Sequence, residues 1–157
     1  MKHLVLSSIA VAALLLSGCS KKTPEADTTS TSNADRLAAL ASQIQSEVGT
    51  VYFDFDKFNI RADQQGTINN NAALFNQAGA ESLTVKVEGN CDEWGSDEYN
   101  YALGLKRATA AKDALVAQGV NESRISVVSY GESNMVCTEH SKECDAQNRR
   151  DEFKVGF

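Results

Sequence analysis

The sequence predicts an α+β fold, a two-layer α/β sandwich in which helices pack on one face of a small mixed four-stranded sheet. Segments whose apolar residues alternate with polar ones, as in half-buried strands, are separated by segments whose apolar residues repeat at helical spacing. Their order is β-α-β-α-β-β. The chain has 157 residues, of which 42% are hydrophobic, so it can bury the core of one domain but hardly of two.

The first three elements are expected early in the globular part of the chain. Residues 51–56, VYFDFD, alternate apolar and polar side chains and predict the first strand. Residues 62–77 carry apolar side chains on one helical face and predict the first helix. Residues 83–88 alternate again, which predicts the second strand.

The second helix is predicted to run from Ser96 to Gly119, because Ser96 can cap it and acidic residues occupy its first turn. Four residues share the stripe that is expected to face the sheet: Tyr99, Leu103, Ala110 and Ala114. Residues 125–130, ISVVSY, and residues 152–157, EFKVGF, predict the last two strands, with a loop or short helix between them.

The start of the chain has the layout of an export signal. Residues 1–18 combine a basic start with an apolar run that is too short for a comfortable membrane span. The run ends in LSGC, which resembles a bacterial lipobox and implies that Cys19 is lipid-modified and becomes the N-terminus after cleavage. Several acyl chains make such an anchor effectively permanent. Ser20 stands where an Asp would indicate retention at the inner membrane, which implies an outer-membrane location.

Residues 19–50 are expected to join the lipidated Cys19 to a domain of residues 51–157. Their first part is rich in Thr and Ser and has almost no apolar residue, which is typical of a flexible tether. Apolar residues between Leu37 and Val48 then repeat at helical spacing. They predict a short amphipathic segment, which either extends the stalk or packs on the domain.

Export places the remaining cysteines, Cys91, Cys137 and Cys144, in an oxidising compartment, and three cannot all pair. A disulfide between Cys137 and Cys144 would close a small loop. The alternative is a periplasmic redox or metal-binding lipoprotein whose cysteines and His140 gather around zinc, although Cys-x6-Cys is looser than the usual spacing. A catalytic Cys91–His140 pair has weak support, and the sequence holds no hydrolase or phosphate-loop motif.

The charge balance limits the possible partners. The formal net charge is -6 and no face is rich in Lys or Arg, so nucleic acid is a poor candidate. Lys106 and Arg107 both border the predicted buried stripe of the second helix, where an unpaired cation would be costly. Asp92, in the loop before this helix, is the candidate partner. A purely internal ion pair or a solvated side chain is an alternative to a ligand site, and periodicity does not decide between Lys106 and Arg107.

The stretch EGNCDEWGSDEYNYALGLKRATAAKDAL resembles the peptidoglycan-binding signature of the OmpA-like domain family, in which a strand and an acid-containing loop precede Y-N-x-x-L-x-x-x-R-A. FDFDKFNI, SYGE and NRR stand where that family has its opening strand, its third strand and the motif before its final strand. The resemblance covers residues 51–157. Asn90 and Cys91 differ from the usual His and small residue before the acid. NCDEWG and the Cys137–Cys144 region are most similar to the variants of the Helicobacter and Campylobacter group.

The resemblance implies a non-enzymatic protein that binds peptidoglycan and tethers the outer membrane to the cell wall, with a TolB-like periplasmic partner and no cofactor or metal. Its ligand would be the meso-diaminopimelate of the peptide stem. Asp92 would accept from the ammonium of this zwitterion, while Arg107 would hold its carboxylate with two parallel hydrogen bonds. The resemblance places four further residues near the site: Asn100, Gly95, Asn148 and Arg149.

Overall fold

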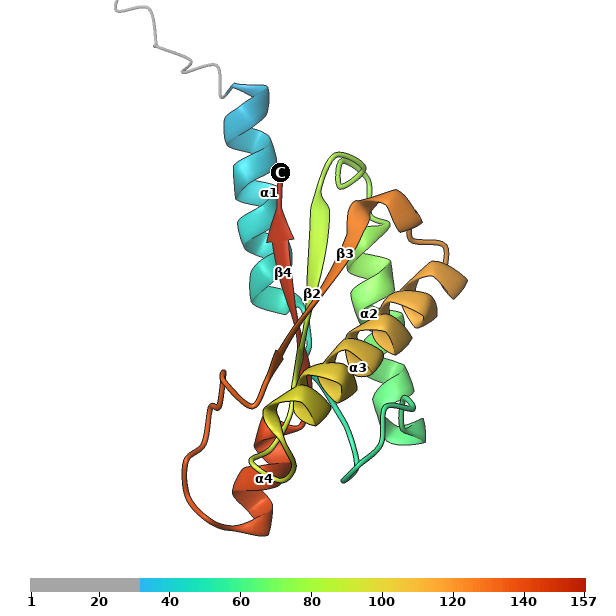
Figure 1. The fold of residues 1–157 in the computed structure, drawn as a ribbon. Coiled ribbons are helices and arrows are strands. Elements are labelled where there is room, and N and C mark those ends of the chain that lie inside the picture. The colour runs from blue at the N-terminus through green and yellow to red at the C-terminus, as the bar shows by residue number, and fades with distance from the viewer. Residues whose placement is uncertain (1–31) are drawn as a thin grey trace, which may run out of the picture. The chain divides into compact units, whose positions relative to one another are not determined.

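The computed structural model describes residues 32–157 and confirms the predicted α+β fold, a four-stranded mixed sheet with helices packed on it (Figure 1). The described elements are α1 (Asn33–Glu47), β1 (Val51–Tyr52), η1 (Ala62–Gln64), α2 (Gln65–Phe75), β2 (Thr84–Asn90), α3 (Asp97–Ala117), η2 (Glu122–Arg124), β3 (Ile125–Gly131), α4 (Lys142–Asn148) and β4 (Arg150–Gly156). The predicted signal peptide and lipidated Cys19 lie outside these residues. No helix among them is both long enough and apolar enough to cross a membrane.

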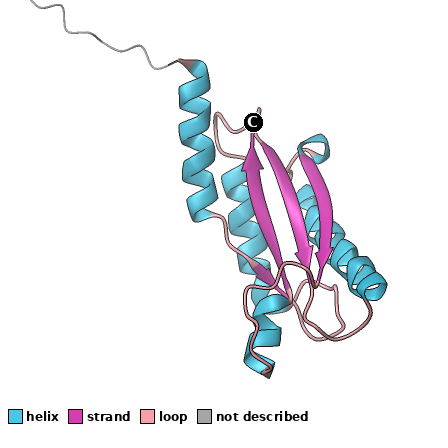
Figure 2. Cartoon of the chain, turned by 60° about the vertical axis from the view of Figure 1, so that its left-hand side comes forward, coloured by secondary structure: helices cyan, strands magenta, loops and turns pink. Residues whose placement is uncertain are grey.

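The sheet has the strand order β1-β4-β2-β3, with β2 and β3 parallel and the other neighbours antiparallel. Helices α2 and α3 cover one face of it (Figure 1 and Figure 2). The core lies between them and the sheet, where Phe75 of α2 packs with its ring centroid 6.3 Å from that of Phe153 in β4. Because β2 and β3 are parallel and β4 runs the other way, the loops after β2 and β3 meet the segment before β4 at one end of the sheet.

Helix α1 packs along the edge of β4 and belongs to the folded unit. Ile44 is fully buried in the core, and the Gln45 side-chain amide donates to the Phe153 carbonyl at 3.0 Å and accepts from the Val155 N–H at 2.8 Å. These bonds satisfy the part of the β4 edge that the two-residue β1 leaves unpaired. Of the two possibilities open for this segment, the structure shows packing on the domain. Helix α1 therefore packs on the same core as the elements that follow it.

The first strand is shorter than predicted. It ends at Tyr52 rather than at residue 56, because the chain turns through residues 54–57, with the Lys57 N–H donating to the Asp54 carbonyl at 3.2 Å. Phe53 is still buried, but Phe55 is 60% exposed. The alternating pattern therefore predicted the burial of the first part of the segment correctly and failed for the second part. There the Asp54 and Lys57 carbonyls accept hydrogen bonds from the Arg107 side chain.

Helix α3 begins and ends as predicted but is rotated about its axis. Ser96 caps its first turn by accepting from the Tyr99 N–H, yet Tyr99, which was expected to face the sheet, is 50% exposed. The rotation brings Gly104 against Gly89 of β2, so closely that a Cβ on Gly89 would lie 1.9 Å from the Gly104 carbonyl oxygen. This close contact between two glycines turns Arg107, near Gly104 on the helix surface, fully into the interior.

Candidate functional site

An ion pair joins two of the segments that meet at the end of the sheet. Asp92 follows β2 and Arg149 precedes β4, and the Arg149 Nη1 donates to the Asp92 Oδ2 at 2.9 Å. Both side chains are mostly buried, with 5% and 14% of their surfaces exposed. Arg149 also donates through Nε to the Phe53 carbonyl at 3.1 Å, while its Nη2 has no acceptor within the described part of the chain. The pair therefore connects three loops and keeps one donor group spare.

A hollow of about 250 Å³ lies beside Asp92. Three aromatic side chains line it, and each is half or more exposed: Phe55 at 60%, Trp94 at 59% and Tyr99 at 50%. Exposed aromatic faces next to a mostly buried carboxylate suit a ligand that has both apolar surface and a positive group. Neither Arg107 nor Arg149 lines this hollow, although Arg149 pairs with Asp92 at its edge.

Gly95 and Asn100 hold the loop that carries Asp92. Gly95 has φ +126°, which an L side chain rarely adopts, and a Cβ there would lie 3.2 Å from the Asn100 Oδ1. The buried Asn100 amide donates to the Asp92 carbonyl at 3.4 Å and to Glu132. Gly95 and Asn100, two of the four further residues expected near the site, therefore lie next to Asp92. Gly95 forms part of the wall of the hollow, and Asn100 lies behind the loop.

Arg107 is fully buried, and its donors are already in use. It donates through Nε to the Lys57 carbonyl at 2.8 Å, through Nη1 to the Asn90 carbonyl at 2.9 Å, and through Nη2 to the Asp54 carbonyl at 3.2 Å. Its guanidinium carbon also lies 5.2 Å from the centre of the Phe53 ring, a cation–π distance. Arg107 forms no ion pair with a carboxylate of the described residues. In this conformation it fixes the loops on either side of the hollow and does not reach a ligand.

Lys106, the other cation at the helix border, behaves differently. Its Nζ lies 5.6 Å from the centre of the Phe58 ring, and Phe58 is 41% exposed. The helix rotation thus settles the choice that periodicity left open: Arg107 is the buried cation and Lys106 is the surface one.

Asp151 of β4 is a buried carboxyl group without a hydrogen-bond partner on either oxygen among residues 32–157. Burial raises the pKa of Asp151 well above its usual value near 3.8, and the positive charge of Arg107 opposes that rise. The folded chain therefore keeps this proton at pH values where the unfolded chain has released it.

We expect Asp151 to lower the stability of the fold as the pH rises. Since its folded pKa exceeds its unfolded pKa, the free energy of unfolding falls with pH above the ordinary carboxyl range, until the folded pKa is passed. Denaturant unfolding at a series of pH values should show this decline in the wild type and a flatter profile in Asp151→Asn. Asp113→Asn, an exposed position on α3, is the control. Parallel profiles for the wild type and Asp151→Asn would contradict the expectation.

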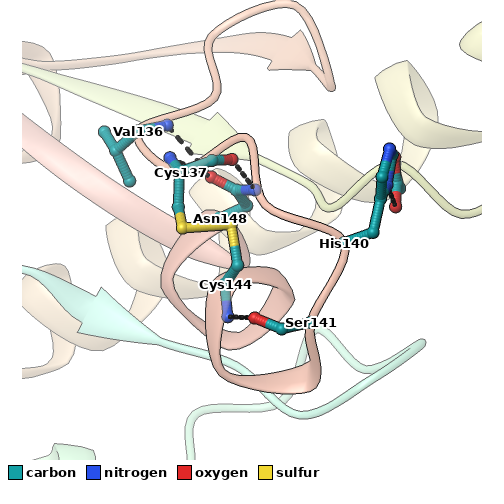
Figure 3. The surroundings of a disulfide bond; sticks show 7 residues. Val136, Cys137, His140, Ser141, Cys144 and Asn148 are labelled. Carbon is teal, nitrogen blue, oxygen red and sulfur yellow. Dashed lines mark hydrogen bonds and ion pairs between the residues drawn. A yellow bond between two sulfur atoms is a disulfide. The ribbon is translucent and has the colours of Figure 1, made fainter.

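The predicted disulfide between Cys137 and Cys144 is present, with 5.3 Å between the two Cα atoms (Figure 3). The buried Asn148 side chain braces the same loop, since its Oδ1 accepts from the Val136 and Cys137 N–H groups and its Nδ2 donates to the Cys137 carbonyl at 2.8 Å (Figure 3). Asn148 is thus a loop-bracing residue, whereas its neighbour Arg149 contacts Asp92. These bonds tie α4 to the loop that precedes it.

The cysteines give no support to the redox or metal alternative. Cys137 and Cys144 are bonded to each other, and Cys91 is buried, with its Sγ donating to the Asn100 carbonyl at 3.2 Å. Burial raises the pKa of Cys91 to about 11, so the thiol is protonated near neutral pH and a poor nucleophile. His140 instead pairs with Glu93 at 2.8 Å. Across residues 32–157, no three His, Cys, Asp or Glu side chains gather as metal ligands do.

Residues 52–150 match the sequence profile of the OmpA family, and the chain belongs to that family. It is 40% identical over 144 residues to a peptidoglycan-associated lipoprotein of Mesorhizobium japonicum, covering 89% of this chain and 84% of the relative. A peptidoglycan-associated lipoprotein of Pasteurella multocida is 43% identical over 68% of this chain and 70% of its own length.

Solved structures agree with the fold. The crystal structure of the peptidoglycan-associated lipoprotein from Burkholderia pseudomallei matches with a TM-score of 0.64 and 34% identity, over 68% of this chain and 89% of that one. The C-terminal domain of Helicobacter pylori MotB has a TM-score of 0.63 at 23% identity, over 70% of this chain and 85% of that one, and shares the fold alone. The expected similarity to variants of the Helicobacter and Campylobacter group stays a prediction.

Proposed function

We propose that this chain binds peptidoglycan non-covalently, without turning it over, through the meso-diaminopimelate of the peptide stem. The observation that carries the proposal is the ion pair between Asp92 and Arg149, set beside a hollow with exposed aromatic walls. The names of the relatives that match the greater part of the chain support the same function.

A zwitterionic ligand fits this site because its binding exchanges the Asp92–Arg149 ion pair for two ion pairs, one between each side chain and the ligand. The free end of diaminopimelate carries an ammonium and a carboxylate on one carbon. Asp92 would accept from the ammonium, and Arg149 would turn its Nη groups toward the carboxylate, using the Nη2 that has no acceptor among the described residues. The protein then leaves neither buried charge unpaired, whereas a ligand with one charge would strand the other partner.

We assign Arg107 a positioning role in the same site. It was expected to hold the carboxylate itself, but its guanidinium is buried and donates to carbonyls on both sides of the hollow. Direct contact with a ligand would need the loop of residues 54–57 to move away. The loops that Arg107 fixes carry Asp92 and Phe55, so its loss would weaken binding through them.

The proposed cellular role follows from combining this binding with the expected anchor. The lipidated Cys19 would hold the chain in the outer membrane while the folded unit, facing the periplasm, binds the wall. The protein would thereby tether the membrane to the wall as part of a Tol–Pal-like system that supports envelope integrity and cell division, with a TolB-like periplasmic partner.

Sedimentation of the purified protein with insoluble cell wall tests the proposal. We expect binding to a diaminopimelate-type wall, and binding weaker by roughly 10- to 100-fold to a lysine-type wall, because lysine lacks the second carboxylate and leaves Arg149 unmatched. No muropeptides should be released. Equal binding to both walls would contradict the proposed ligand, and release of muropeptides would indicate a hydrolase instead.

A further inference from the structure

A second hollow of about 360 Å³ adjoins the first. Phe55 and Trp94 line both hollows and so stand between them, each with more than half of its surface exposed. Lys142 and Asp145 of α4, together with Arg149, complete the lining of the second hollow. A ligand held at Asp92 in the first hollow could therefore continue past the two aromatic side chains into the second.

The second hollow presents a spare positive charge. Lys142 is exposed and has no ion pair or side-chain hydrogen bond to any described residue. The carboxylate of Asp145 is already an acceptor for the Trp94 indole, whose Nε1 donates to its Oδ2 at 2.9 Å. Arg149 is engaged with Asp92. Lys142 is thus the one charged side chain of this lining that has neither an ion pair nor a side-chain hydrogen bond among the described residues.

The backbone that carries Lys142 is held next to the aromatic walls. The disulfide ties α4 to the preceding loop, and the Ser141 hydroxyl caps the helix by accepting from the Cys144 N–H at 3.2 Å (Figure 3). The Trp94–Asp145 bond and the 2.8 Å pair between Glu93 and His140 join this unit to the loop that carries Asp92. A braced site loses less conformational entropy when a ligand binds.

We infer that the second hollow binds the part of the peptide stem next to diaminopimelate, with Lys142 pairing with its carboxylate and Phe55 and Trp94 packing on its apolar atoms. The neighbouring residue in the stem is a γ-linked D-glutamate, whose α-carboxylate is free. The inference rests on the proposed function, because Asp92 and Arg149 must first place diaminopimelate in the adjoining hollow.

The test compares free diaminopimelate with the stem tripeptide, carrying its D-glutamate carboxylate either free or amidated. Trp94 is the only tryptophan of the chain, so its fluorescence reports binding of all three to the full-length protein. We expect the free-acid stem to bind roughly two- to five-fold more tightly than the amidated stem. Lys142→Gln should remove this preference and leave the affinity for free diaminopimelate unchanged. Lys154→Gln, on a strand away from both hollows, is the matched control.

A second variant tests the aromatic wall. Trp94→Leu, followed by calorimetry, should lower the affinity for the amidated stem roughly ten-fold, whereas Tyr101→Leu, a change at another exposed aromatic residue, should not.

The inference is overturned if Lys142→Gln keeps the wild-type preference for the free acid, or if the wild type binds the stem no better than diaminopimelate alone. The proposed function survives both results. Failure of the wild type to bind diaminopimelate at all would overturn the proposed function and this inference together.

Discussion

Asp92→Asn is expected to reduce the affinity for diaminopimelate-type wall by roughly 30- to 1000-fold, equivalent to about 2 to 4 kcal/mol. Asparagine has the size of aspartate and keeps an oxygen that can accept from Arg149, so the loop should stay folded. It has no negative charge, and the ammonium of the ligand would be placed beside an uncharged amide in a mostly buried position. Sedimentation with wall at fixed salt concentration measures the loss.

The control for this change is Asp97→Asn, the same substitution at an exposed position in the first turn of α3. It removes one negative charge from the same end of the molecule, so any general effect of net charge on wall binding appears in both variants. Only Asp92→Asn should weaken binding to the diaminopimelate-type wall, because only Asp92 belongs to the ion pair beside the hollow. If both variants bind the wall as the wild type does, Asp92 is not the ammonium acceptor.

Local chemistry explains which parts of the fold could be predicted from the sequence. The limits of α3 are set by Ser96, which caps the first turn, and by Gly119, whose φ of +90° ends the helix, and both signals lie in the residues themselves. The alternating strands were found for the same reason, since their inward side chains meet one continuous core.

The rotation of α3 could not be predicted, because it depends on a distant strand. A stripe drawn from apolar residues alone places Tyr99 inward, whereas the close approach of Gly104 to Gly89 determines which face is buried. The first strand was predicted to be longer than it is for a similar reason. Its pattern continues through Phe55, but the turn that exposes Phe55 also supplies the Asp54 and Lys57 carbonyls to Arg107.

The candidate site was predictable in its composition but not in its pairing. The resemblance placed Asp92, Gly95, Asn100 and Arg149 in one region, and they do lie together. It could not show that Arg149 is the guanidinium beside Asp92, because both arginines have the same charge and reach. Lys142 carried no signal in the sequence: its importance comes from the Cys137–Cys144 loop, which brings α4 beside Trp94.

Arg107→Ala is expected to lower the free energy of unfolding by about 3 to 5 kcal/mol. The change leaves a cavity under the Phe53 ring and removes the donors of three carbonyls, those of Asp54, Lys57 and Asn90. Arg107→Lys should recover part of the loss, since an ammonium can satisfy one or two of these acceptors but cannot span both loops as a guanidinium does. Denaturant unfolding measures both variants.

Wall binding by the same variants separates a positioning residue from a ligand contact. If Arg107 acts by fixing the loops, Arg107→Lys binds both wall types more weakly but still prefers the diaminopimelate type, because Asp92 and Arg149 continue to recognise the zwitterion. Arg149→Lys should show the reverse, a fold of nearly unchanged stability that has lost much of its preference between the walls. An Arg107→Lys protein that folds normally and no longer distinguishes the walls would mean that the loop of residues 54–57 opens and that Arg107, not Arg149, holds the carboxylate.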